Sequence, residues 1–152
     1  MAKIEIANLK GEKVKHANIS DVVGLVGGRN EKNDVMLIQA LFHIAGANSP
    51  HIRKDIFGFE SYSDLPKITG DLDPVTIETI WKFQRHNAHR LLSVDGIVHP
   101  ASYEKREIKE PYTKPVMMIT YLNMKAEYST RHSFKDDLAF AIKHYAPSIV
   151  LV

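Results

Sequence analysis

The sequence predicts an α+β fold, in which a core of three helices carries an appended small β-sheet and a C-terminal helix. Residues 3–9 alternate between apolar and charged side chains, whereas two later segments carry apolar residues at helical spacing. A turn-and-helix motif also occurs twice within residues 68–102. The length of 152 residues suits one domain with a small subdomain.

The N-terminal residues are expected to form two strands. Ile4 and Ile6 alternate with charged residues over positions 3–9, which is typical of a half-buried strand. A turn at residues 10–13 then leads to a return strand over residues 14–19.

The first helix is predicted after Asn33 and Asp34, either of which can cap its N-terminus. Apolar residues recur at helical spacing from Val35 to Ala45. Gly46 is a suitable stop signal.

A second helix is predicted to begin at Pro74, with Asp73 as its N-cap, and to end near Ala88. Its inward stripe is expected to comprise Ile77, Ile80, Phe83 and Gln84. Residues 47–69 between the two helices show no clear periodicity, and loops this long are often functional.

The remaining chain is predicted to supply a short third helix over residues 100–106, an apolar strand over 116–122, a fourth helix capped by Ser133, and a terminal strand over 148–152. The inner face of the fourth helix is expected to comprise Phe134, Leu138, Ala141, Ile142 and Tyr145. Both chain ends would then contribute to the small sheet.

The sequence predicts a division of the chain into three segments. Residues 1–21 form the N-terminal strands, residues 22–108 the helical core, and residues 109–152 a C-terminal strand–helix–strand subdomain.

The internal repeat aligns residues 68–76 with residues 94–102. Both copies read apolar, polar, Gly, any residue, apolar, any residue, Pro, any residue, hydroxyl. Such a pattern indicates a tight turn at Gly70 and at Gly96, each followed by a helix that begins with proline.

With this ordered set of motifs, residues 22–105 resemble the peptidoglycan-binding domain family, a small three-helix module of bacterial cell-wall hydrolases. The matching positions are Val35, Ile38, Gln39, Gly70, Pro74, Thr76, Phe83, Gln84, Asp95, Gly96, Pro100 and Ser102. The chain departs from the family pattern at Thr69, Asp73 and His99, and its loop between the first two helices is longer. The resemblance implies a peptidoglycan-binding-like core and a ligand in the bacterial wall.

Composition excludes several classes of function. The formal net charge of +2 argues against a nucleic-acid partner, and no apolar run is long enough for membrane insertion. The absence of cysteine excludes disulfides and thiolate catalysis. No cofactor motif occurs. The N-terminal residues lack a signal-peptide pattern, so we expect cytoplasmic synthesis and, for a wall ligand, unconventional export to the wall or periplasm.

Ligand-binding candidates are Trp81, Gln39, Gln84, Arg85, Asp95, Phe59 and Tyr62. Trp81 can stack on a sugar ring or close over the appended subdomain. Gln39 and Gln84 can contact a ligand, or tie their helices to loop backbone. Asp95 is interpreted foremost as a turn residue.

We expect neither a metal site nor an active site. His86 and His89 have a permitted ligand spacing but no recognisable third ligand. The loop carboxylates Asp55, Glu60, Asp64 and Asp71 are interpreted as solvated, although paired carboxylates perform glycoside hydrolysis in other proteins.

The sequence therefore predicts a non-enzymatic module that docks on peptidoglycan, either glycan or stem peptide. The alternative is an intracellular adaptor, immunity or effector-loading protein. Its partner would bind the C-terminal subdomain through Met117, Met118, Met124, Tyr121, Tyr128 and Phe134. A cell-wall hydrolase that uses the loop carboxylates is a weaker alternative.

Overall fold

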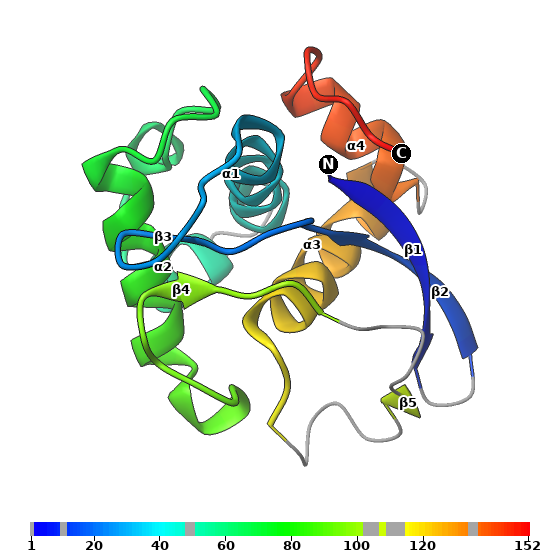
Figure 1. The fold of residues 1–152 in the computed structure, drawn as a ribbon, viewed down its shortest axis with the longest axis horizontal. Coiled ribbons are helices and arrows are strands. Elements are labelled where there is room, and N and C mark those ends of the chain that lie inside the picture. The colour runs from blue at the N-terminus through cyan, green and yellow to red at the C-terminus, as the bar shows by residue number, and fades with distance from the viewer. Residues whose placement is uncertain (1, 10–11, 48–50, 102–106, 109–114, 134–136) are drawn as a thin grey trace.

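The computed structural model describes residues 2–9, 12–47, 51–101, 107–108, 115–133 and 137–152, and shows a mixed α+β fold (Figure 1). Its strands and helices are β1 (Lys3–Leu9), β2 (Glu12–Asn18), β3 (Val23–Gly24), α1 (Lys32–Ala47), α2 (Pro74–His86), β4 (Ile97–Val98), β5 (Glu107–Ile108), α3 (Met118–Ser133) and α4 (Leu138–Tyr145). Single turns of helix lie at Ile52–Ile56, Tyr62–Asp64 and Ala88–Arg90. The long loop predicted over residues 47–69 thus contains two of these short turns.

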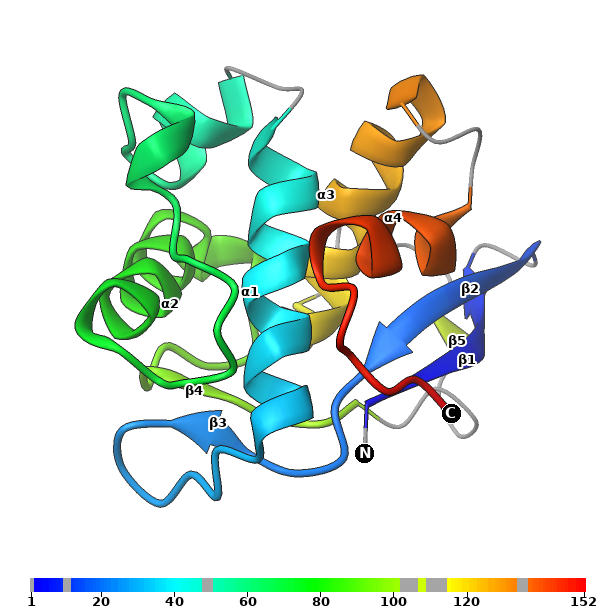
Figure 2. The ribbon, with the colours of Figure 1, turned by 90° about the horizontal axis from the view of Figure 1, so that it is seen from above.

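Helix α1 forms the centre of the molecule, with α2 on one side and α3 and α4 on the other (Figure 2). Every residue from Asp34 to Gly46 is buried, so α1 has no solvent-facing stripe. The predicted first helix is confirmed, but its surroundings are more apolar than those of an ordinary amphipathic surface helix. The predicted N-cap is wrong, because α1 begins at Lys32 and both Asn33 and Asp34 lie within its first turn. The Asp34 carboxylate instead accepts from the N–H groups of Ser20 and Asp21.

The larger sheet has the strand order β2–β1–β5. Strand β1 pairs antiparallel with β2, with Lys3 opposite Asn18, and parallel with β5. Strands β3 and β4 form a second, antiparallel pair in which Gly24 lies opposite Ile97. The two predicted N-terminal strands are therefore confirmed, although the second runs over Glu12–Asn18 rather than 14–19. Ile6, expected on the half-buried face of the first strand, is instead 53% exposed.

The predicted strand over residues 116–122 is wrong, because α3 begins at Met118. Only Val116 makes a strand-like contact, as its N–H donates to the Arg90 carbonyl. Ile119, Leu122 and Ala126 are fully buried and follow helical spacing. A short apolar run is consistent with either a buried strand or a buried helix, and here packing against α1 favours the helix.

Three predictions for helix and strand ends also need correction. Asp137, not Ser133, caps α4, since its carboxylate accepts a hydrogen bond from the Phe140 N–H. Pro100 and the residue after it are not helical, and the rest of the predicted third helix lies outside the described residues, as does Phe134. The C-terminal segment forms no strand.

The two chain ends nevertheless meet. The Val152 N–H donates to the Ala2 carbonyl, and the Ile4 N–H donates to the Val152 carbonyl. The prediction that both ends join the sheet is thus confirmed for the N-terminal strands only. The C-terminal segment contributes these two backbone hydrogen bonds at the start of β1, whereas β5 pairs with Asn8 and Leu9 at its end.

Asparagine side chains tie the elements together by binding both backbone groups of a single residue. Asn123 on α3 binds the N–H and the carbonyl of Ala17, at 2.7 Å each, on the outer edge of β2. Asn30 binds both groups of Gly24 in the same way. These amides satisfy strand edges that would otherwise need another strand or water.

One hydrophobic cluster includes residues from each of the three predicted segments, among them Ala17, Phe42 and Ile142. The division of the chain at residues 21 and 108 stays a prediction. None of the helices in the described ranges combines the length and the apolar character needed to cross a bilayer.

Candidate functional site

The first turn of the internal repeat is organised by Gln39 on α1. Its Oε1 atom accepts hydrogen bonds from the N–H groups of Thr69 (3.0 Å) and Gly70 (2.9 Å). Its Nε2 atom donates to the Asp71 carbonyl (2.9 Å) and to Thr76 Oγ1 (3.0 Å). The φ angle of +84° at Gly70 is one that residues with a Cβ rarely adopt.

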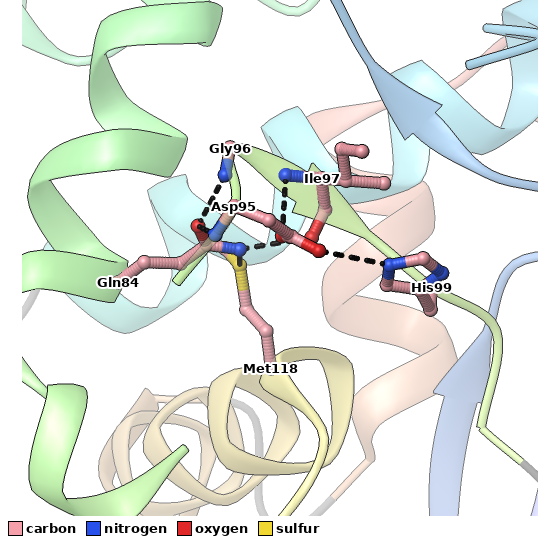
Figure 3. A network of polar contacts seen from close by, with 6 residues as sticks. All are labelled: Gln84, Asp95, Gly96, Ile97, His99 and Met118. Atoms are coloured by element: carbon pink, nitrogen blue, oxygen red, sulfur yellow. Dashed lines mark hydrogen bonds and ion pairs between the residues drawn. The ribbon is translucent and has the colours of Figure 1, made fainter. Parts of the chain in front are cut away.

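The second turn is organised by Gln84 on α2 in the same manner (Figure 3). Its Oε1 atom accepts from the N–H groups of Asp95 (3.2 Å) and Gly96 (2.7 Å), and Gly96 has a φ of +73°. Its Nε2 atom donates to the Ile97 carbonyl (2.8 Å) and to Met118 Sδ (3.3 Å).

The two turn units are therefore equivalent around their glycines. In both, the glutamine oxygen binds the glycine N–H and the N–H before it, while the glutamine nitrogen binds the carbonyl after it. Gln39 and Gln84 are the only glutamines of the chain, and both are 0% exposed. Two roles were expected for these glutamines, ligand contact or hydrogen bonding between helix and loop backbone. In the structure both side chains hydrogen-bond to loop backbone, and neither is accessible at the surface.

Trp81 packs directly against the second turn. A Cβ atom built on Gly96 would lie 2.5–2.7 Å from the indole atoms Cε2, Cζ2 and Nε1 of Trp81, so only glycine leaves room for this contact. The Arg85 guanidinium carbon lies 5.7 Å from the centre of the same ring system. The structure thus brings together four of the predicted site residues around one turn, namely Trp81, Gln84, Arg85 and Asp95.

A groove of about 390 Å³ runs along the outer face of α2, and its lining residues are Pro74, Ile77, Glu78, Trp81 and Arg85. Their spacing of three and four residues places them on one stripe of the helix. The prediction that Ile77 faces inward needs correction, since it is only half-buried and lines this groove. The buried stripe comprises Thr76, Thr79, Ile80, Phe83 and Gln84.

The other candidates lie around or away from this groove. Asp95 is exposed, and its carboxylate accepts from the Ile97 N–H and lies 3.2 Å from His99 Nε2. Phe59 is half-buried beneath Lys82, whose Nζ is 4.9 Å from the ring centre. Tyr62 lies elsewhere, beside α1.

Tyr62 belongs to a cluster that the sequence did not reveal. His43 Nε2 lies 2.5 Å from the Pro66 carbonyl and Nδ1 lies 2.8 Å from the Tyr62 hydroxyl. Because a carbonyl only accepts, Nε2 carries the proton and Nδ1 accepts from Tyr62. Tyr145 of α4 completes the cluster, with its ring 5.8 Å from that of His43 and its side chain hydrogen-bonded to Tyr62.

This cluster stabilises neutral side chains. Burial lowers the pKa of His43 below its usual 6.5, although the Pro66 hydrogen bond acts in the opposite direction. Burial likewise raises the pKa values of Tyr62 and Tyr145 above 10.0. His43 lies within the apolar stretch of α1. From the sequence alone it is one polar residue in a buried helix, and nothing there indicates the contact with Tyr62.

The loop carboxylates act locally. Asp55 pairs with His51 at 2.6 Å, and Asp64 accepts from the Ser61 N–H in its own turn. His86 and His89 are exposed, and in the described part of the chain no group of three or more His, Cys, Asp or Glu side chains is arranged to hold a metal.

Four of the six side chains suggested for contact with a protein partner are described by the structure, and these four are largely interior. Met118 is 6% exposed and Tyr121 5% exposed, while Met117 and Met124 are half-buried. The side chains of Tyr128 and Phe134 lie outside the described part of the structure. The four described side chains therefore expose little surface.

Comparisons with models of protein families, with curated proteins and with solved structures found no match to this chain.

Proposed function

We propose that the protein is a non-catalytic binding module that docks on bacterial peptidoglycan through the groove on α2. The observation that carries the proposal is the position of Trp81, the only tryptophan, against Gly96 of the second turn unit and at the wall of this groove. A flat aromatic surface beside polar groups is suited to a sugar ring and its substituents.

The groove combines apolar and charged walls. Pro74 and Ile77 supply apolar surface, whereas Glu78 and Arg85 supply a carboxylate and a guanidinium on the same stripe of α2. Peptidoglycan presents apolar ring faces, hydroxyl and amide groups, and the charged ends of its stem peptides. The lining of the groove therefore offers a complementary group for each of these features.

The resemblance to the peptidoglycan-binding domain family supports the same proposal. Both turns of the motif set share one hydrogen-bonding arrangement, as a duplicated unit requires. The family's second turn glycine is replaced by Asp73, but Asp73 has a φ of −87° and caps α2, so this position does not need glycine. We propose on these grounds a peptidoglycan-binding-like core.

The proposal is tested by co-sedimentation with purified insoluble peptidoglycan. We expect the wild type to be retained and Trp81→Ala to be retained about tenfold less, because an aromatic stacking contact worth about 1.4 kcal/mol corresponds to a tenfold change in affinity. Phe140→Ala is the matched control, since Phe140 is an aromatic residue of α4 that is 59% exposed and does not line the groove.

Circular dichroism and thermal unfolding show whether each variant is folded. A folded wild type that stays in solution would overturn the proposal and would favour a protein partner instead. Equal retention of the wild type and of a folded Trp81→Ala would place any wall contact outside the groove. Release of soluble muropeptides during the assay would contradict the non-catalytic assignment.

A further inference from the structure

Among the described residues, Arg85 is the charged lining residue of the groove on α2 that has no ion-pair partner. Glu78, the other charged lining residue, has Lys82 as a partner, with Nζ 3.5 Å from its carboxylate. Within the described ranges no carboxylate lies at ion-pair distance from Arg85, whose recorded contact is with the Trp81 ring. The groove therefore presents a cation to an incoming ligand.

The contact with Trp81 holds the guanidinium group without using its donors. The Arg85 Cζ atom lies 5.7 Å from the ring centre, and a cation above an aromatic ring interacts with the ring's π electrons. The N–H groups of a guanidinium point outward in its plane, where they match the two oxygens of a carboxylate. Arg85 is thus positioned to bind a carboxylate while it stays on the indole.

Trp81 and Arg85 are neighbours within the groove. One part of the indole lies against Gly96, where a Cβ would approach it to 2.5 Å, and Trp81 and Arg85 both line the groove. A group that packs against Trp81 from within the groove consequently lies near the guanidinium. Trp81 would then contact a ring or an apolar group of the ligand, while Arg85 would bind a negative charge next to that group.

We propose, resting on the function proposed above, that the groove selects peptidoglycan through the carboxylates of its stem peptides, with Arg85 as the specificity-determining residue. The glycan strand without free carboxylates, like neutral N-acetylglucosamine polymers, would bind weakly. Charge complementarity favours the stem peptide over the glycan strand. Arg85 loses hydrating water when a ligand binds, and an anionic group replaces that hydration better than a neutral one.

The experiment compares two forms of the same insoluble peptidoglycan, one untreated and one whose carboxylates are converted to amides with carbodiimide and ammonia. Co-sedimentation is measured at about 0.15 M salt, where non-specific surface attraction is partly screened. We expect the wild type to bind the amidated wall at least tenfold more weakly, which corresponds to the loss of one charge-assisted hydrogen-bonded pair.

Two substitutions assign the effect to Arg85. Arg85→Gln should bind both walls equally and weakly, whereas Arg85→Lys, which keeps the charge, should retain part of the preference. Arg90→Gln is the matched control, because it removes one positive charge from the single helical turn that follows α2, outside the groove, and we expect it to keep the full preference.

The possible results separate this inference from the proposed function. Equal binding of the wild type to both walls would overturn the role of carboxylates while the proposed function stands. A preference that survives in Arg85→Gln, or that is lost equally in Arg90→Gln, would overturn the role of Arg85. Failure of the folded wild type to bind either wall would overturn the proposed function itself.

Discussion

The two turn units differ in what covers their glycines, although they share one hydrogen-bonding arrangement. At Gly70 the space that a Cβ would occupy is filled by Lys32, whose Cγ lies 2.5 Å from that position. At Gly96 the same space is filled by the indole of Trp81. One turn is thus covered by a flexible aliphatic stem and the other by a rigid ring.

This difference distinguishes the residues that maintain the fold of the two turn units from the side chain that belongs to the candidate site. The glutamine, the glycine and the bonds between them are the same in both copies, which assigns these groups to the fold. The covering side chain is free to differ, and of the two covering side chains only Trp81 lines the groove on α2, to which the first copy contributes Pro74. The candidate site therefore results from a change on the outside of a conserved internal arrangement within this chain.

Removing a glutamine should produce the largest effect. We expect Gln39→Leu to lower the free energy of unfolding by about 3 kcal/mol, because it strands two N–H groups and a carbonyl that are wholly or partly buried. Gln84→Leu should cost about 2 kcal/mol, since one of its acceptors is the Met118 sulfur, a weak acceptor. Urea unfolding measures both values.

Thr76→Val is the control for the first turn unit, as it removes one of the four hydrogen bonds of Gln39 and keeps the shape of the side chain. It should cost about 1 kcal/mol. A loss below 1 kcal/mol in both glutamine variants would contradict the assignment of these amides to the fold, and a larger loss for Gln84→Leu would reverse the order we derive.

Replacing Gly70 or Gly96 by alanine should distinguish the Lys32 side chain that packs on the first glycine from the Trp81 ring that packs on the second. Both glycines have positive φ, so either substitution costs about 1–2 kcal/mol in backbone strain. Gly96→Ala should cost about 1 kcal/mol more, because three atoms of the rigid indole lie within 2.7 Å of the Cβ position and the ring must move. At Gly70 the Lys32 side chain can rotate, and the Lys32 carbonyl oxygen, 3.1 Å away, needs only a small shift. Since Trp81 is the only tryptophan, its fluorescence emission should shift in Gly96→Ala and stay unchanged in Gly70→Ala.

Gly58→Ala provides the strain alone, because Gly58 has a φ of +71° and nothing lies within 4 Å of its Cβ position. It should cost less stability than Gly70→Ala, where Lys32 must also adjust, and should leave the emission unchanged. Equal stability losses in all three variants, with an unshifted emission in Gly96→Ala, would show that Trp81 does not pack on the second turn.

Much of this fold could be predicted from local patterns. The alternation at Ile4 and Ile6 predicted β1, and Asp73 followed by Pro74 predicted the start of α2. Local patterns failed where tertiary packing decides the outcome. The residues from Met118 to Leu122 have an apolar, β-prone composition, but burial between neighbouring elements makes them a helix.

The site could be predicted only in part. The glycine turns were visible as a repeat, and Trp81 and Arg85 were visible as residue types suited to binding. The contact between Trp81 and Gly96 was not, because it joins positions 15 residues apart through the geometry of a turn. The His43 cluster joins α1, Tyr62 and α4, and no spacing along the chain indicates such a meeting.

Acidification should weaken the contact between His43 and Tyr62, because protonation of Nδ1 removes the acceptor for the Tyr62 hydroxyl while the Nε2–H bond to Pro66 remains. The folded pKa of His43 lies below 6.5, so the unfolded chain binds the proton first and stability is lost as the pH falls below 6.5. The slope contributed by His43 reaches at most about 1.4 kcal/mol per pH unit and disappears below the folded pKa. Unfolding measured between pH 7.5 and 5 (about one unit above and 1.5 below the usual histidine pKa) tests this.

His43→Gln should be less stable at neutral pH but should lack this part of the slope, because glutamine does not titrate. His89→Gln, which removes an exposed histidine, should keep the wild-type slope. A slope that is the same in wild type and His43→Gln would show that the cluster does not oppose protonation.

The smallest effect on stability is expected from Lys82→Met. The Lys82–Glu78 pair is solvent-exposed on α2 at a distance of 3.5 Å, so its loss should cost no more than about 0.5 kcal/mol. Retention on untreated peptidoglycan should nevertheless fall about twofold, because an unpaired Glu78 carboxylate would repel the carboxylates that Arg85 binds, and added salt should abolish this difference. Lys82→Arg, which keeps the charge, should behave like the wild type. A tenfold loss of retention that salt does not restore would instead mean that Lys82, above the Phe59 ring, contacts the wall directly and that the binding surface extends beyond the groove.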